Sequence, residues 1–281
     1  MDMQIYNVEG HEPSFLPDGC KFQLVWHDEF DGHELDRSKW NFRLNFWGKR
    51  FPAYTEEGVV LDGESNLKIY LIEKGGQYSS AQLQTGTNVF DYLNVKERKG
   101  GFGEDVAFWP FDDIPKPTFL HCYGYYEIRC KLQKQPGWWS AFWLQSQTPG
   151  LSADDPSYCG MEIDIMENFK RDGTVTSGIF YGNYTNNSRS DARVTYKVNP
   201  DEFHRFGVHW KRDGYVFYCD GKETARSTSG YVSKIPQFIL VTTECSGYRH
   251  NDPPRPSDEL KKAVLPDCFT VDYVRVFDEV E

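Results

Sequence analysis

Short runs of alternating apolar and polar residues recur along the chain, separated by Gly, Pro, Asn and Asp. This pattern is typical of β-strands in a sandwich or barrel, and helical periodicity is nearly absent. In Tyr126–Leu132 the apolar residues share one face and the charged residues the other, which predicts a half-buried strand. Similar runs predict strands at Phe22–Glu29, Leu67–Glu73, Trp138–Gln145, Met161–Asn168, Thr174–Tyr184, His204–Trp210, Phe238–Glu244 and Phe269–Phe277.

Turn signals and two longer stretches complete the predicted all-β organisation. Asp220-Gly221, between Val216–Cys219 and Lys222–Arg226, predicts a type I′ hairpin because both central positions favour positive φ. Thr85–Leu120 and the proline-rich Ser246–Pro266 are interpreted as long loops that wall a cleft. Since all-β folds often exceed about 200 residues as one unit, residues 1–281 are interpreted as a single domain.

Composition narrows the possible partners and location. The net charge of −11 disfavours nucleic-acid binding, which needs clustered Lys and Arg, and weakly disfavours a sulfated polymer. Seven cysteines without a C-x-x-C pair predict mostly free, buried thiols rather than a zinc site or a disulfide framework. No apolar run approaches the ~20 residues of a membrane span, and Met1–Gly10 lacks signal-peptide character. We therefore expect a monomer that is cytoplasmic, or a trimmed secreted or periplasmic form.

The segment Met161–Asn168 carries three carboxylates on one predicted strand. In a regular strand Glu162 and Asp164 share a face, whereas Glu167 points into the core, where an unpaired carboxylate costs several kcal/mol. A one-residue β-bulge at Ile165-Met166 returns Glu167 to the face of Glu162, and we predict that bulge. The two Cα atoms then lie about 13 Å apart at ~3.3 Å per residue. Long side chains can bring the carboxyls to the ~5–5.5 Å of a retaining glycosidase.

Each of these two segments also has a purely structural interpretation. Acidic runs usually decorate a solvated strand face, but no Lys or Arg within this segment offsets the repulsion, and such a cost is expected at a functional site. In Gly137–Leu144, Trp139, Ala141 and Trp143 share a face. That face is either ordinary core or a stacking platform for pyranose rings.

The segment Glu162-Ile163-Asp164-Ile165-Met166-Glu167, preceded by Trp-Ser-Ala-Phe-Trp-Leu, closely resembles glycoside hydrolase family 16. That family includes laminarinases, lichenases, agarases, carrageenases, porphyranases and xyloglucan-active enzymes. The spacing matches the bulged branch, typical of laminarinases and marine-galactan enzymes. The likeness runs from about Phe22 to Phe277 and includes Trp26–Gly32, Asp62-Gly63, Gly124–Arg129, Phe217–Lys222 and Val271–Phe277.

The resemblance implies a concanavalin-like β-jelly roll whose concave sheet forms the substrate cleft. By position, Glu162 is the expected nucleophile, Glu167 the general acid/base and Asp164 the partner that tunes the nucleophile. Trp139 and Trp143 match the family's sugar-stacking tryptophans.

The outer subsites depart from the family pattern. Trp47 and Tyr181 stand in the segments that replace a Trp-Gly-Asn-x-Glu stretch and a laminarinase histidine, and we expect both to contact sugar. No cofactor is expected. Some members hold a structural calcium near the equivalent of Asp272, although one carboxylate is little evidence for six or more ligands.

The expected activity is retaining, endo-acting hydrolysis of a β-linked polysaccharide or oligosaccharide, with β-1,3-glucan of the laminarin type favoured. The alternatives are a β-galactan hydrolase (agarase, porphyranase or carrageenase type), a transglycosylase and a non-catalytic carbohydrate-binding jelly roll. Basic residues in loop-like segments are candidates for binding sulfate: Lys49, Arg50, Arg249, His250 and Arg255.

Overall fold

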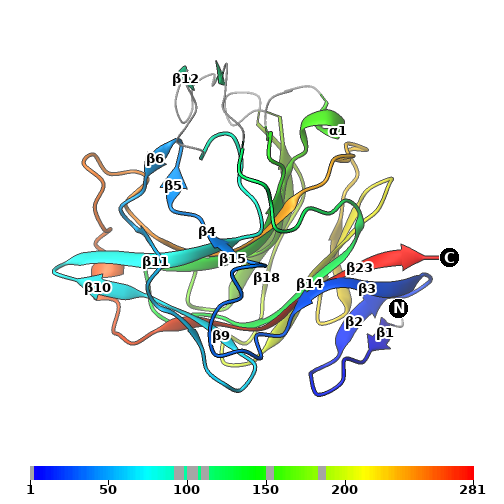
Figure 1. The fold of residues 1–281 in the computed structure, drawn as a ribbon, viewed down its shortest axis with the longest axis horizontal. Helices are drawn as coiled ribbons and strands as arrows, with labels where there is room; N and C mark the ends of the chain where they lie inside the picture. Colours follow the sequence, from blue (N-terminus) through cyan, green and yellow to red (C-terminus); the bar gives the residue numbers. More distant parts are fainter. Residues whose placement is uncertain (1–2, 92–97, 100–106, 109–113, 150–154, 183–187) are drawn as a thin grey trace.

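Two sheets pack face to face around a shared apolar core (Figure 1). The computed structural model describes residues 3–91, 98–99, 107–108, 114–149, 155–182 and 188–281. The nine-stranded sheet has the order β10 (Ile72–Lys74), β11 (Gln77–Gln84), β22 (Phe238–Cys245), β15 (Trp138–Gln145), β16 (Glu162–Asn168), β17 (Thr174–Tyr181) and β18 (Arg189–Lys197), with β4 (Asn41–Phe42) and β7 (Tyr54–Thr55) paired to β11.

The eight-stranded sheet forms the opposite layer. Its order is β21 (Lys222–Arg226), β20 (Tyr215–Cys219), β19 (His204–Trp210), β14 (Gly124–Lys131), β23 (Cys268–Val280), β9 (Leu67–Tyr70) and β8 (Val59–Leu61), with β3 (Lys21–Asp28) paired to β23. Three small hairpins lie outside both sheets: β1 (Met3–Tyr6) with β2 (Ser14–Pro17), β5 (Asn45–Phe46) with β6 (Lys49–Arg50), and β12 (Arg98–Lys99) with β13 (Ala107–Phe108). The helices are α1 (Pro156–Cys159) and η1 (Leu260–Lys262).

The predicted all-β sandwich is confirmed, and most strands lie where alternation placed them. The bounds of β15 and β19 are those predicted, and Asp220-Gly221 turns with φ of 48° and 73°. The predicted strand Leu67–Glu73 is wrong in one respect, because the chain crosses between sheets there and forms β9 and β10. Of the predicted Thr174–Tyr184, residues 183–184 lie outside the described residues, as do 92–97, 100–106 and 109–113 of Thr85–Leu120.

The prediction of free thiols is confirmed for all seven cysteines, but the prediction of burial holds only for Cys130, Cys159 and Cys245. The other four are partly exposed: Cys20, Cys122, Cys219 and Cys268. Neither helix within the described ranges has the length and apolar character that a membrane span requires.

The prediction of a solvated charged face on β14 is wrong at Glu127. Tyr126, Ile128 and Cys130 enter the core as expected, but Glu127 on the other face is also fully buried. Its carboxylate accepts hydrogen bonds from the Phe15 backbone N–H (3.1 Å) and the Tyr273 hydroxyl (2.8 Å). Strand β2 therefore covers this face, and burial raises the pKa of Glu127 to about 7.

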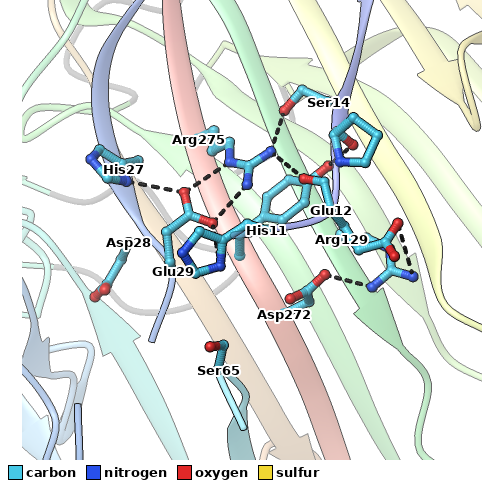
Figure 2. A network of polar contacts seen from close by, with 12 residues as sticks. His11, Glu12, Ser14, His27, Asp28, Glu29, Ser65, Arg129, Asp272 and Arg275 are labelled. Carbon is cyan, nitrogen blue, oxygen red and sulfur yellow. Dashed lines mark hydrogen bonds and ion pairs between the residues drawn. The ribbon is translucent and has the colours of Figure 1, made fainter. Parts of the chain in front are cut away.

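A network of charged side chains joins the N-terminal segment to the eight-stranded sheet (Figure 2). The guanidinium of Arg275 is fully buried and donates from Nε and Nη2 to the two carboxylate oxygens of Glu29, at 2.9 and 2.7 Å. Its Nη1 also donates to the Glu12 carbonyl and the Ser14 hydroxyl. Because Glu29 follows β3 and Arg275 lies in β23, this pair fixes the β3–β23 edge.

The same network bears on the calcium suggested near Asp272. Arg129 Nη1 lies 2.5 Å from Asp272 Oδ2, and Arg275 occupies both oxygens of Glu29 (Figure 2). Two guanidinium groups thus take up the acidic oxygens that a calcium ion would need. The residues present around Asp272 do not fit calcium.

We predict that Arg275→Met destabilises the fold by about 3–5 kcal/mol, because it leaves Glu29 buried without its cation. Urea denaturation at neutral pH measures this change. Lys74→Met is the matched control: Lys74 and Glu57 form an ion pair with both side chains more than half exposed, so its loss costs less than about 1 kcal/mol. Equal effects of the two substitutions would contradict the assignment.

Candidate active site

A β-bulge in β16 sets the direction of the acidic side chains. Met166 pairs with Phe142 and Asp164 with Trp143, so Ile165 is the extra residue in the ladder with β15. Ile165 and Met166, although consecutive, are both buried in the main core. The predicted bulge is therefore present, and it returns Glu167 to the face that carries Glu162 and Asp164.

Neighbouring strands hold the bulge in place. The ladder with β17 also shifts between Asp164 and Glu167. A bulge leaves backbone groups without ladder partners, and the Ser177 hydroxyl of β17 donates to the Ile165 carbonyl at 2.9 Å. Ser177 was not predicted as a site residue, and its hydroxyl satisfies the buried carbonyl that the bulge creates.

Glu162, Asp164 and Glu167 line one cavity of about 290 Å³ against the nine-stranded sheet. Trp139, Ala141 and Trp143 of β15 line it too, so the predicted platform faces the cavity, whereas Phe142 and Leu144 enter the core. The two long stretches contribute walls as predicted, through Asn88, Phe90 and Asp91 from the first and Arg249 from the second.

Burial and the repulsion of neighbouring carboxylates raise the pKa values of Asp164 and Glu167. Burial, followed by the charge of Glu162, raises the pKa of Glu167 to about 8. Burial, followed by the charges of Glu167 and Glu162, holds the pKa of Asp164 well above its usual range. Arg193 on β18 partly opposes both shifts. Near neutral pH the cluster therefore retains protons, with Glu167 protonated beside Glu162.

A chain of amides orients Glu162. Gln145 at the end of β15 donates from Nε2 to Glu162 Oε2 at 3.3 Å, and its Oε1 accepts from Asn88 Nδ2 at 2.6 Å. The Asn88 side chain in turn accepts from the Asp91 backbone N–H at 2.9 Å. Sequence reasoning missed this chain, because Asn88 and Gln145 meet only after β15 is placed beside the loop.

Three predicted tryptophans line the cavity, each held differently. Trp143 donates from Nε1 to Thr242 Oγ1 at 3.0 Å, and Trp139 lies 5.6 Å from the Phe169 ring. Trp47 stacks on Phe90, with ring centroids 5.0 Å apart. It also has a φ of 52°, unusual for a bulky residue, which places it in the tight turn between β5 and β6. Its packing in the cavity wall maintains this costly conformation.

Tyr181 does not join the site, contrary to expectation. Its ring lies in the main core and contacts Tyr231 at 5.0 Å. Alternation on β17 explains the correction: Phe180 pairs directly with Glu162, so its neighbour Tyr181 points through the sheet.

Two ion pairs with buried carboxylates, missed from the sequence, flank the acidic cluster. Arg43 Nε donates to Asp91 at 2.6 Å, and Arg249 pairs with Glu244 of β22, whose carboxylate also accepts from the Tyr54 hydroxyl at 3.1 Å. Burial and the charge of Glu244 raise the pKa of Tyr54 to about 12. Of the residues suggested for sulfate, Arg249 is thus neutralised by its partner, while Lys49, Arg50 and Arg255 lie exposed on the surface, as does His250.

Comparison with known proteins agrees with this geometry. The profile of the family described as Glycosyl hydrolases family 16 matches residues 116–262, more than half of the chain. Glucan endo-1,3-beta-glucosidase A1 of Niallia circulans is 26% identical over 91% of this chain and 38% of its own length. Endo-1,3-1,4-beta-glycanase EglC of Rhizobium meliloti (strain 1021) is 24% identical over 82% of this chain and 47% of its own length. The chain thus spans less than half the length of these two relatives.

Solved structures share the fold. The catalytic domain of an endo-1,3-beta-glucanase (laminarinase) from Thermotoga petrophila RKU-1 superposes with a TM-score of 0.63 at 24% identity, covering 94% of this chain and 100% of that one. The endo-beta-1,3-glucanase from Pyrococcus furiosus gives 0.61 at 23% identity, covering 94% and 97%. At these identities the likeness establishes the concanavalin-like sandwich.

We predict that Glu167→Gln becomes increasingly stabilising as pH rises from about 4.5 to about 8. The folded pKa of Glu167 is raised from 4.5 to about 8, so its contribution to stability is full below 4.5 and is lost as pH rises through 8. Glutamine never has to ionise. Since one pKa unit is about 1.4 kcal/mol, the variant should exceed wild type by at least that amount at pH 9.

Urea denaturation at pH 5, 7 and 9 tests this dependence. Glu9→Gln, at an exposed carboxylate, is the control and should run parallel to wild type. Parallel curves for Glu167→Gln as well would show that Glu167 does not have a raised pKa.

Proposed function

The chain belongs to glycosyl hydrolase family 16, and on that basis we propose that it is a retaining endo-β-glycanase that hydrolyses internal β-glycosidic bonds of a polysaccharide. One observation carries the proposal. The bulge at Ile165 places Glu162 and Glu167 on one face of β16 and in one cavity. Two carboxyls with different protonation states are what a double displacement at an anomeric carbon requires.

In the first step, the proton held by Glu167 passes to the glycosidic oxygen as the bond to the leaving sugar breaks. The carboxylate of Glu162 attacks the anomeric carbon and forms a glycosyl ester. Formation of that ester removes the negative charge of Glu162, whose repulsion helps to raise the pKa of Glu167. The pKa of Glu167 then falls, and its carboxylate can accept a proton from water in the second step. Water opens the ester, and anomeric configuration is retained.

The other cavity residues position the substrate and the nucleophile in this proposal. Trp139, Trp143 and Trp47 present indole surfaces to pyranose rings. Gln145 donates to one oxygen of Glu162 and thereby restrains its carboxylate. Asp164, protonated by burial between the two glutamates, can donate to Glu162 and tune its basicity.

A neutral β-1,3-glucan of the laminarin type is the proposed substrate. Within the described part of the cavity, the lining cations are Arg43 and Arg249, and each is paired with its own buried carboxylate. A sulfated galactan would bring negative charge toward a cluster that is already acidic. The names of both relatives above, a glucan endo-1,3-beta-glucosidase and an endo-1,3-1,4-beta-glycanase, support the same choice.

We expect Glu162→Gln to reduce cleavage of laminarin roughly 1,000-fold or more, because the amide cannot form the glycosyl ester. Release of reducing ends measures the loss, and proton NMR of the earliest wild-type product should show the β-anomer. Glu57→Gln, at a half-exposed surface carboxylate, should cleave normally. An α-anomer would rule out the double displacement, and equal absence of turnover in wild type and variant would favour a carbohydrate-binding protein.

We also expect wild type to cleave laminarin at least about tenfold faster than the sulfated galactans porphyran and carrageenan, because a misplaced sulfate costs more than 1.4 kcal/mol in an acidic cavity. Initial rates on equal masses of each polysaccharide, and on mixed-linkage glucan, measure the preference. Faster cleavage of a galactan would overturn the substrate while leaving the mechanism intact.

A further inference from the structure

Three side chains that can ligate a transition metal converge on the face of the eight-stranded sheet that points away from the core. Cys20 precedes β3, His209 lies in β19 and Glu279 lies in β23, and their ligand atoms are all within 4.8 Å of one another. Phe206, Val208 and Trp210 of β19 enter the core, so alternation places His209 on the outer face. The catalytic cavity belongs to the other sheet.

The imidazole of His209 is buried, and its Nε2 has no hydrogen-bond partner among the described residues. The residue is 3% exposed, and its imidazole packs against Phe22 and Tyr125, with ring centroids at 5.3 and 6.5 Å. Among the described residues, none makes a hydrogen bond with its Nε2. Glu279 Oε2 lies 3.3 Å from that atom, outside hydrogen-bond geometry. A buried ring nitrogen without a hydrogen bond is costly, and a bound ion would satisfy it.

The distance between His209 Nε2 and Glu279 Oε2 suits tetrahedral coordination of one metal ion. In tetrahedral zinc sites, nitrogen and oxygen ligands each lie about 2.0–2.2 Å from the metal, which places them about 3.4 Å apart. The observed 3.3 Å is close to that edge. Thiolate and imidazole ligands select zinc and its neighbours over calcium or magnesium, which prefer oxygen.

We propose that Cys20 Sγ, His209 Nε2 and a carboxylate oxygen of Glu279 form a zinc-binding site with a fourth position open to water. The half-exposed side chain of Glu279 gives solvent access to the ion. The nearby ammonium of Lys211 lies 3.3 Å from Asp213, which offsets its charge. A bound ion would tie the start of β3 to β19 and β23, at a site separate from the proposed hydrolysis.

A second cluster, with aspartate in place of glutamate, differs from the first in that its polar groups have protein partners. His204, Cys219 and Asp220 also lie close together, but both ring nitrogens of His204 are engaged, by Asp220 at 2.7 Å and by the Asn199 carbonyl at 2.9 Å. Asp220 accepts a further hydrogen bond from the Arg205 backbone N–H at 2.8 Å. Its donors and acceptors are satisfied by protein, so this cluster serves as an internal control.

The test is zinc binding by the full chain, purified with chelator and titrated with Zn²⁺ against a chromogenic competitor. Wild type should bind one equivalent, and Cys20→Ser and Glu279→Gln should each weaken binding at least about tenfold, as loss of a ligand or its support does. Cys219→Ser, in the satisfied cluster, should bind like wild type. With Co²⁺ in place of zinc, a thiolate-to-metal charge-transfer band should appear in wild type and be absent from Cys20→Ser.

Thermal unfolding gives a second readout. Zinc should raise the unfolding temperature of wild type and Cys219→Ser but not that of Cys20→Ser, because an ion that binds only the folded state stabilises it. Both decisive substitutions are at partly exposed or exposed positions, so neither depends on a variant of buried His209 folding. Failure of wild type to bind one equivalent, or equal binding by Cys20→Ser, overturns the site whatever the glycanase assays show.

Discussion

A β-strand places successive side chains on opposite faces, and the function proposed for this chain requires one strand to depart from that rule. Residues 162 and 167 are separated by an odd number of positions, so a regular β16 would bury one of the two glutamates in the sandwich core. Inserting Ile165 as an extra residue reverses the alternation once. The Ile165-Met166 pair then fills the core, and the carboxyls share a cavity. The positions of the proposed acid and the proposed nucleophile both depend on this local change of register.

By placing three carboxyls on one face, the bulge also brings their negative charges close together. Three carboxyls on one half-buried face repel one another, and the surrounding arginines do little to relieve them. Arg43 and Arg249 are already paired with Asp91 and Glu244, and the charges of Arg193 and then Arg249 oppose the raised pKa of Glu167 only in part. The cluster responds by retaining protons, and a carboxylic acid that keeps its proton near neutral pH is suited to general acid catalysis. The same raised pKa lowers the free energy of unfolding at high pH, where Glu167 must ionise.

The outer face of the opposite sheet holds the N-terminal segment on the sandwich. Buried Arg275 and partly buried Arg129 neutralise Glu29 and Asp272 (Figure 2). The proposed zinc site lies on the same face and joins β3 to β19 and β23. Both devices attach N-terminal residues to β23, one by guanidinium pairs and the other by a coordinated ion.

Features that depend on neighbours in sequence could be determined from the sequence alone. Alternation located β15 and β19, the Asp220-Gly221 pair fixed a hairpin, and the acidic spacing required a bulge at Ile165-Met166. Features that depend on which strands meet could not. The burial of Glu127 under β2, the inward direction of Tyr181 and the Asn88–Gln145–Glu162 chain all arise from contacts between distant segments. Cys20, His209 and Glu279 carry no metal-binding spacing for the same reason. The local pattern follows from backbone geometry, which has a period of two residues in a strand. Which distant residues come into contact is decided by strand order and sheet packing.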